Sequence, residues 1–368
     1  MINLKKIWCL QIFLFIFFAG QSSLGTANDS PPPLEMVKKQ FDVGLVPGLK
    51  SSRLLLVKND DAALPDKLVL VAEVSGKDTV ILSAKSALAK INNVYSPKSY
   101  DGFNVSVVKG VDKTIGVVDS QGEIYTFKSD AHVVGDVLNL ITEKEDQTSQ
   151  NFNVQFEYDA TRKSVAVSRV VYTVNNESCD RSLKSAYVLP SNVLISKSLE
   201  DFDGATAFEY LQKLNSEIQA GRVKGEKLMS SFVVSTADQA FVAYKNHDKN
   251  KLIESMGYLV ADGGSSESCA PESYIAEAYF YPDKVGWSND LGFLFAEAGY
   301  YSESVELLRK VISENPERTV AYLNIADAYW GLSQKDLAAE NYKKYISMMQ
   351  QSGKAMKIPK RVLERSGS

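Results

Sequence analysis

The sequence predicts an α+β multidomain protein, in which a β-rich N-terminal domain (a sandwich or a barrel) is followed by an α-helical repeat domain. Three observations support this. Up to about residue 196, short β-branched runs alternate with turn residues, as strands and hairpins do. Beyond about residue 199, apolar residues recur at the spacing of amphipathic helices. Between positions 285 and 350 the pattern repeats every 34 residues, a period that is typical of stacked helical hairpins.

The segment 1–27 has the pattern of a secretory signal peptide. Lys5 and Lys6 form a short positive segment, and the almost wholly apolar run 7–19 follows them before small residues at the expected cleavage site. This run is shorter than the roughly 20 residues that a membrane-spanning helix needs, so cleavage is favoured over an uncleaved anchor. We therefore expect a periplasmic or secreted protein, with no integral membrane segment after cleavage.

Charge and composition narrow the class of partner. The 368-residue chain has 41 Lys and Arg against 45 Asp and Glu, a net charge of −4, and loss of the two signal lysines makes the net charge −6. Nucleic-acid binding needs concentrated Lys and Arg to neutralise phosphates, so we expect no nucleic acid as partner.

Two cysteines, Cys179 and Cys269, remain after the predicted cleavage. In an oxidising compartment such a pair favours one disulfide bond, and two separate buried thiols are the alternative.

The β-rich domain is expected at 51–196, after an extended leader, 28–50, that contains three consecutive prolines. Strands are expected at 68–72, 80–82, 114–118, 123–127, 152–158 and 165–174. The last four form two hairpins, with turns at 119–122 and 159–163. The only helix expected in this domain is 84–91.

A helical connecting region is expected at 197–284. Its first apolar residues recur at three-residue spacing: Phe202, Ala205, Phe208, Leu211 and Leu214. Asp203 is a candidate N-terminal cap for this helix, and Gly221 is a candidate stop. Helical patterns continue at 237–244 and 252–260.

Two copies of the repeated pattern occupy 285–350. The first copy consists of Ser288, Leu291, Gly292, Phe295, Ser304, Leu308 and Pro316. The second consists of Tyr322, Ile325, Ala326, Tyr329, Ala338, Tyr342 and Gln350. Small residues at Gly292 and Ala326 let two helices approach closely, and we expect Phe295 and Tyr329 to be buried beside them.

This pattern resembles the tetratricopeptide repeat (TPR) family. Half of the pattern recurs in the connecting region, as a degenerate third copy, at Ala270, Tyr274 and Pro282. The C-terminal cap and tail, 351–368, contains a helix-breaking Gly353 and then a candidate capping helix at 358–363. A repeat array needs such a cap to cover its apolar end.

The resemblance implies a function in binding. Family members mostly bind peptides or protein surfaces in a concave groove lined by the first helix of each pair. The matching positions in this sequence are Asn289, Phe293, Glu297, Leu323, Asp327 and Trp330. A protein or peptide partner is therefore implied, and a plain packing or solvated role is the alternative at each position. The basic residues of the family's carboxylate-binding clamp are absent from these positions, so capture of a C-terminal peptide is not expected.

No catalytic or metal-binding motif is found. The two histidines, His132 and His247, lie in an apolar stretch and in a polar turn, and neither neighbours a serine elbow or a second ligand at metal spacing. No Gly-rich phosphate-binding loop follows a strand. The sequence therefore predicts a non-enzyme with no catalytic residues, no metal site and no cofactor.

The expected function is that of an envelope adaptor or assembly factor. One alternative is an inhibitor or immunity protein that masks a toxin or lytic enzyme. Another is a hydrolase with its site in the β-rich domain. An adaptor should expose groove residues, an inhibitor should present a protruding loop, and a hydrolase should bring titratable groups together in a pocket.

Overall fold

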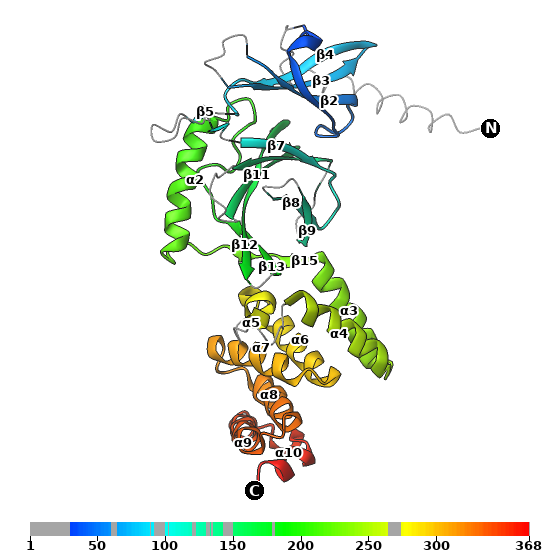
Figure 1. Ribbon diagram of the computed structural model, residues 1–368, viewed down its shortest axis with the longest axis vertical. Helices are drawn as coiled ribbons and strands as arrows, with labels where there is room; N and C mark the ends of the chain where they lie inside the picture. Colours follow the sequence, from blue (N-terminus) through cyan, green and yellow to red (C-terminus); the bar gives the residue numbers. More distant parts are fainter. Residues whose placement is uncertain are drawn as a thin grey trace, which may run out of the picture. The chain divides into compact units, whose positions relative to one another are not determined.

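A computed structural model of the chain describes residues 30–59, 65–88, 90–91, 100–101, 103–119, 123–129, 133, 135–142, 150–178, 181–263 and 274–367. The predicted signal peptide, His132 and both cysteines of the predicted disulfide lie outside these ranges. A β-rich N-terminal region is followed by a helical C-terminal region, as the sequence predicts (Figure 1).

The chain divides into two compact units. We call the first, Met1–Thr173 with Tyr187–Gly225, the β unit. We call the second, Val174–Ala186 with Glu226–Ser368, the helical unit. The predicted connecting region, 197–284, is therefore divided between them.

The first sheet of the β unit is an antiparallel meander. Its strands are β1 (Val37–Asp42), β2 (Lys50–Val57), β3 (Lys67–Val74) and β4 (Lys77–Ala84), and the short 3-10 helix η1 (Leu34–Met36) precedes them. The predicted strands 68–72 and 80–82 are confirmed as parts of β3 and β4. The hairpin between them turns at Ser75 and Gly76, whose φ angles of 56° and 76° suit a tight two-residue turn.

Burial on both faces explains the continuous apolar runs of this sheet. Leu68 and Leu70 are fully buried, while Val69 and Val71 pack on the other face with Leu55. A strand covered on both sides does not alternate polar with apolar residues. By contrast, β1 is mostly exposed and its sequence has only a weak apolar pattern. It lies within the predicted leader, 28–50, where no strand is expected from the sequence.

The second sheet contains the neighbouring strands β13-β12-β11-β10-β7, in that order. The strands are β7 (Phe103–Val108), β10 (Val137–Thr142), β11 (Gln150–Asp159), β12 (Ser164–Ser178) and β13 (Arg181–Leu189). Two further pairs are β5 (Lys90–Ile91) with β6 (Tyr100–Asp101), and β8 (Thr114–Val118) with β9 (Ile124–Lys128). Both predicted hairpins are confirmed, as β8–β9 and as the neighbouring strands β11 and β12.

The helix predicted at 84–91 is wrong. Ala84 ends β4, where it pairs with Leu68, and Lys90 and Ile91 form β5. The ladder between β3 and β4 extends to Ala84, and such pairing within a sheet overrides a local helix propensity.

Helix α2 (Gly204–Gln219) covers part of the second sheet in the β unit (Figure 1). Its predicted cap is confirmed, because Asp203 Oδ1 accepts a 2.8 Å hydrogen bond from the Thr206 amide. Phe208 packs edge-on against Phe103 of β7, with 6.1 Å between ring centres. The chain turns away after α2 at Gly221, whose φ is 70°.

The helical unit contains the following elements. The strands β14 (Glu226–Lys227) and β15 (Met229–Ser230) precede α3 (Ser231–Lys245), α4 (Lys249–Gly263), α5 (Tyr274–Tyr279), η2 (Pro282–Lys284), α6 (Val285–Ala298), α7 (Tyr301–Glu314), α8 (Thr319–Gly331), α9 (Lys335–Gln351), η3 (Ala355–Lys357) and α10 (Lys360–Arg365). Each helix from α6 to α9 packs on the next, α6 also packs on α4 and α8, and α10 packs on α9. The predicted helices at 237–244 and 252–260 are confirmed within α3 and α4.

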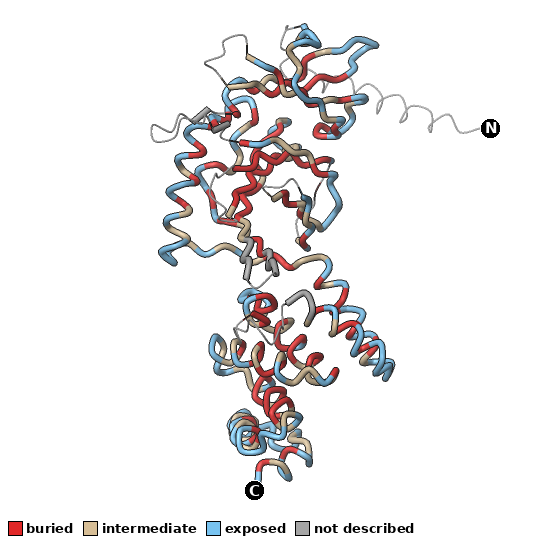
Figure 2. The backbone as a smooth tube through the Cα atoms, viewed as in Figure 1, coloured by how far each residue is buried: buried red, intermediate tan, exposed pale blue. Residues whose placement is uncertain are grey.

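Buried residues occur along each of the helices α3 to α9 (Figure 2). They form two apolar cores, of which one joins α3 to α8 and includes Met256, Leu259 and Phe295. The other joins α7 to α10 and includes Tyr329 and Val362. Phe295 and Tyr329 are therefore buried as predicted, with 0% and 4% exposure.

Candidate functional site

The hairpins α6–α7 and α8–α9 have the same spacing along the chain. Their first helices begin at Val285 and Thr319, and their second helices begin at Tyr301 and Lys335. Both starts therefore recur after 34 residues, which is the predicted repeat period. The residue pairs related by this shift are buried: Ser288 and Tyr322, Leu291 and Ile325, Gly292 and Ala326, Phe295 and Tyr329, Ser304 and Ala338, Leu308 and Tyr342. The two hairpins thus use equivalent positions to pack.

Three of the predicted groove residues lie on α6, where Phe293 contacts α3 and the backbone of Glu297 contacts α4. The ring of Phe293 packs edge-on against Tyr244 of α3, with 5.1 Å between ring centres. Asn289 is almost fully buried, and its Oδ1 has no hydrogen-bond partner. The backbone carbonyl of Glu297 accepts a hydrogen bond from the ammonium of Lys249, at the start of α4. These positions contribute to packing within the helical unit.

The other three lie on α8, where two of them contact the C-terminal helix. Asp327 accepts hydrogen bonds from Arg361 at 2.8 Å and Arg365 at 3.4 Å. The guanidinium carbon of Arg365 lies 4.6 Å from the ring centre of Trp330. Leu323 is partly buried and packs against the second core. Asp327 and Trp330 are thus occupied by α10 in this structure.

Tyr342 of α9 completes this cluster. Its hydroxyl donates a 2.6 Å hydrogen bond to Asp327 and lies 3.2 Å from Nη1 of Arg365. Burial, reinforced by the hydrogen bond to Asp327, raises the pKa of Tyr342 to about 12. The hydrogen bond to the same carboxylate raises the pKa of Arg361 above its ordinary value. We call Asp327, Trp330 and Tyr342 the arginine receptor.

Sequence reasoning missed the arginines that fill this receptor. Two signals were present: Arg361 follows Asp327 by one repeat period, and Arg365 follows Arg361 by one helical turn. Residues four apart on a helix point to the same side, so both guanidinium groups reach α8.

A second cluster fixes the end of α5. The ammonium of Lys227 donates to the carbonyl oxygens of Glu277, Ala278 and Phe280, the last two at 3.1 and 3.3 Å, and lies 4.8 Å from the ring centre of Tyr281. Burial lowers the pKa of Lys227 to about 8. The three carbonyl groups and the aromatic face all favour a cation, so this lysine anchors β14 to the end of a helix.

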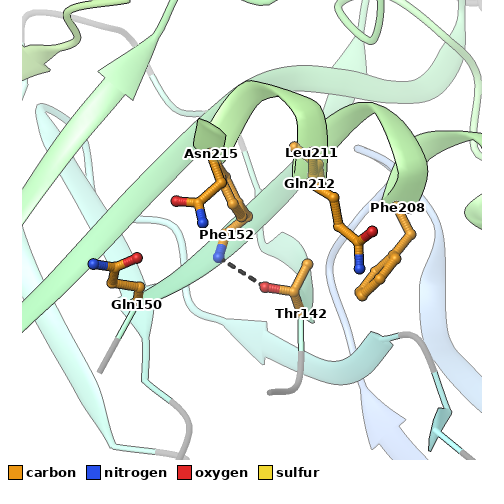
Figure 3. Close-up of a pocket in the computed structure, with 7 residues that line it drawn as sticks. All are labelled: Thr142, Gln150, Phe152, Phe208, Leu211, Gln212 and Asn215. Atoms are coloured by element: carbon orange, nitrogen blue, oxygen red, sulfur yellow. Dashed lines mark hydrogen bonds between the residues drawn. The ribbon is translucent and has the colours of Figure 1, made fainter. Parts of the chain in front are cut away.

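A cavity of about 240 Å³ lies between α2 and the second sheet of the β unit (Figure 3). Phe152, Phe208 and Leu211 supply its apolar surface. Thr142 accepts a 3.0 Å hydrogen bond from the Phe152 amide, and Asn215 Oδ1 is buried with no hydrogen-bond partner. No titratable side chain is among the described residues that line the cavity, so this part of its lining supplies none of the acid–base groups that a hydrolase requires.

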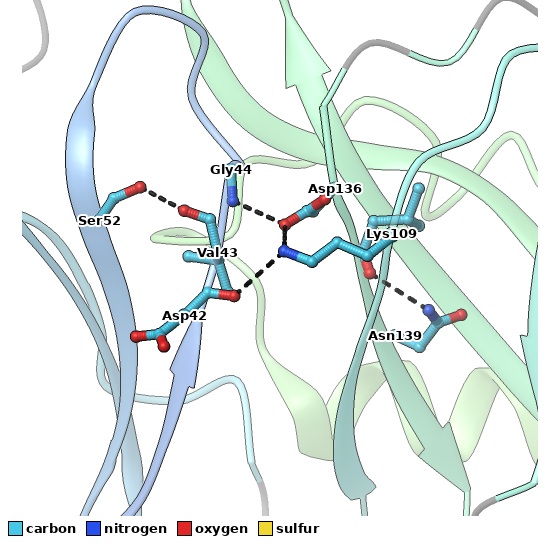
Figure 4. Close-up of polar contacts among 8 residues, drawn as sticks. Asp42, Val43, Gly44, Ser52, Lys109, Asp136 and Asn139 are labelled. Carbon is cyan, nitrogen blue, oxygen red and sulfur yellow. Dashed lines mark hydrogen bonds and ion pairs between the residues drawn. The ribbon is translucent and has the colours of Figure 1, made fainter.

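A charged groove lies elsewhere in the β unit, beside the loop that follows β1. Asp136 is 7% exposed and accepts hydrogen bonds of 2.7 Å from the Gly44 amide and from the ammonium of Lys109 (Figure 4). Ser52 donates its hydroxyl hydrogen to the Val43 carbonyl. These contacts tie the loop to the residue that follows β7 and to the residue that precedes β10.

Close backbone packing supports this clamp. A Cβ atom at Gly110 would lie 1.6 Å from the carbonyl oxygen of Gly135, so no other residue fits there. Gly135 itself has a φ of 82°, a conformation that favours glycine. The cluster around Asp136 is therefore a structural joint.

Neither a metal cluster nor a membrane-spanning helix occurs in the part of the chain that the structure describes. Within it, no group of three or more His, Cys, Asp or Glu residues is arranged to hold a metal ion. No helix in the same ranges is long and apolar enough to cross a membrane. His247 lies in the turn between α3 and α4, with a φ of 58°.

Comparisons with known proteins add no family. A scan against protein-family models gives no match, and a search of curated proteins finds no similar sequence.

Proposed function

We propose that the chain is an exported protein-binding module, an adaptor or assembly factor of the cell envelope, which holds a partner with TPR-like helical hairpins. The supporting observation is that residues one repeat period apart are buried at equivalent positions of the two hairpins. The starts of both helices, and the buried residue pairs between them, recur after one repeat period in α6–α7 and α8–α9. A repeated packing frame of this kind leaves the other positions of α8 for recognition, whereas on α6 Phe293 packs on α3 and Asn289 is buried.

The chemistry of those positions suits a protein partner. On α8 they provide a carboxylate, an indole and a partly buried leucine: Asp327, Trp330 and Leu323. Tryptophan and charged groups beside it are typical of the residues that contribute most to protein–protein affinity.

The proposal of export rests on the segment 1–27. Intact-mass measurement of the exported protein should give a chain that begins close to Asn28. A full-length chain in the membrane fraction would contradict it.

The proposed disulfide between Cys179 and Cys269 follows from the same compartment. Thiol titration of the freshly exported protein, denatured without reductant, should find no free thiol. Two free thiols would rule out the bond.

The function is tested by capture from envelope extract with the mature protein as bait. Wild type should enrich a protein that the Leu323→Ala/Trp330→Ala variant enriches at least about fivefold less, since hot-spot truncations weaken binding by that much or more. Tyr258→Ala is the matched control, because this exposed aromatic residue lies on α4, away from α8. Equal enrichment by wild type and both variants, or no enrichment by wild type, would contradict the proposal.

A further inference from the structure

The arginine receptor matches one chemical group. Around the guanidinium of Arg365 lie a carboxylate oxygen of Asp327 at 3.4 Å, the hydroxyl of Tyr342 at 3.2 Å and the ring of Trp330 at 4.6 Å. A guanidinium donates hydrogen bonds in its plane and stacks on aromatic rings through its face, and this set of groups serves both. An ammonium would use only part of it.

The receptor does not depend on its present occupant. Asp327 and Trp330 belong to α8 and Tyr342 to α9, two helices that pack extensively on each other. Tyr342 is fully buried and donates a 2.6 Å hydrogen bond to Asp327, which orients the carboxylate. A receptor held ready in this way binds without first being ordered.

The occupant, in contrast, is a short segment that follows a turn. Helix α10 has six residues, too few for a stable helix on its own. It follows Gly353, whose φ is 70°, and the fully exposed Met356. Val362 is buried in the second core, whereas the side chain of Arg361 is 46% exposed. The covalent tether adds to its occupancy by raising the local concentration of its arginines at the receptor.

We propose that the arginine receptor is the specificity element of the binding surface, that it takes a helical segment of a protein partner carrying an arginine, and that α10 occupies it as an internal competitor in the free chain. This inference rests on the proposed protein-binding function. A partner must present a guanidinium to the pair Asp327 and Trp330, and must displace α10 to do so.

The experiment uses the chain's own segment as the probe. A fluorescein-labelled peptide with the sequence of residues 355–368 is titrated against the full mature chain and against its Arg361→Ala/Arg365→Ala variant, with anisotropy as the readout. The variant has lost the competing guanidinium groups, so it should bind the peptide about tenfold tighter than wild type does. Its circular dichroism and melting temperature check that it folds, and Arg365→Ala alone serves where the double variant melts early.

Two controls separate recognition from charge. Adding Trp330→Ala to the double variant should weaken peptide binding by about tenfold. A peptide with both arginines replaced by lysine should bind about fivefold more weakly, because it keeps the charge but loses the planar group. Equal binding by wild type and the double variant, no binding by the double variant, or equal binding of the lysine peptide would each overturn the inference.

This outcome is separable from that of the proposed function. Peptide binding with the expected pattern, but no partner captured from extract, would leave the receptor in place and remove the adaptor function. A captured partner whose binding falls in Leu323→Ala/Trp330→Ala but is unchanged by Arg361→Ala/Arg365→Ala would leave the function and remove this inference.

Discussion

The hairpins α6–α7 and α8–α9 share a buried frame but differ in what covers their first helices. On α6, Phe293 contacts an aromatic ring, Tyr244 of α3. On α8, Trp330 contacts a guanidinium, Arg365 of α10. The frame thus needs only a few small and large residues at fixed positions, whereas the remaining surface of each hairpin is adapted to its own neighbour.

Within the buried frame, the residues that meet between the two helices of a hairpin differ in size from one hairpin to the other. Gly292 and Leu308 meet in the first hairpin, where a Cβ on the glycine would lie 2.7 Å from the leucine side chain. The equivalent residues in the second hairpin are Ala326 and Tyr342, both fully buried. The tyrosine extends to Asp327, so the second hairpin joins its core to a polar cluster and the first does not.

The largest expected effect tests the shared frame. Phe295→Ala and Tyr329→Ala each leave a cavity among fully packed side chains and should lower the free energy of unfolding by about 3–5 kcal/mol. Urea unfolding followed by circular dichroism measures the change. The control is Phe241→Ala, whose ring is 44% exposed and whose loss should change stability by less than about 1 kcal/mol.

A loss below about 1 kcal/mol at either buried position would contradict this part of the comparison. It would mean that one hairpin does not depend on the aromatic residue that the other uses at the equivalent position.

Sequence reasoning located the frame because period and residue size are local properties. The spacing of Phe295 and Tyr329 predicts burial without knowledge of any neighbour, and both are buried. The contacts of Phe293 and Trp330 could not be predicted in this way. They depend on α3 and α10, whose docking is decided by three-dimensional packing.

The wrong predictions in the β unit have the same cause, because they depend on pairing that the local sequence does not show. The strands of the two hairpins were predicted because turn residues flank β-branched runs. Strand β1 was missed because only its pairing with β2 makes it a strand, and most of it is exposed. The helix predicted at 84–91 had suitable residues, but the ladder of β4 extends to Ala84. Local propensity was overridden in both places by pairing with a neighbouring strand.

At alkaline pH, the stability contribution of Tyr342 in the second hairpin should change, while that of Leu308 in the first hairpin should not. Burial and the hydrogen bond to Asp327 raise the pKa of Tyr342 to about 12 in the folded chain, against about 10 unfolded. A raised pKa gives stability that is present below about pH 10 and is lost as the pH rises through about 12. The stability advantage of wild type over Tyr342→Phe should therefore shrink by about 1–3 kcal/mol between pH 9 and 12.

Unfolding free energies measured across this range provide the test, with Leu308→Val as control. Leu308 occupies the equivalent position in the first hairpin and does not titrate, so its variant should differ from wild type by a constant amount. If the stability difference between wild type and Tyr342→Phe also stayed constant with pH, the phenol would have the same pKa in the folded and unfolded chain, and the prediction would be wrong.

A smaller effect is expected from adding one methyl group to the first hairpin. Gly292→Ala forces the side chain of Leu308 to move, which costs more than the alanine gains in helix propensity, and should destabilise by about 1 kcal/mol. Gly286→Ala is the control on the same helix, because its Cβ would meet only Arg318 at 3.6 Å. This control should be neutral or stabilising in thermal melts, and destabilisation equal to that of Gly292→Ala would refute the steric explanation.

The smallest expected effects concern what covers each first helix, and here the two hairpins should differ in kind. A double-mutant cycle on Tyr244 and Phe293 should give a coupling of about 0.5–1.5 kcal/mol, typical of an edge-on aromatic pair. A cycle on Asp327 and Arg361 should give about 0.2–1 kcal/mol, because the arginine side chain is 46% exposed. Salt distinguishes the two couplings, since about 1 M salt reduces the Debye length to roughly 3 Å. The ionic coupling should then fall by more than half, while the aromatic coupling should stay unchanged. If both fall together, the covers of α6 and α8 are held by the same forces, and the chemical difference between the two hairpins does not extend to their energetics.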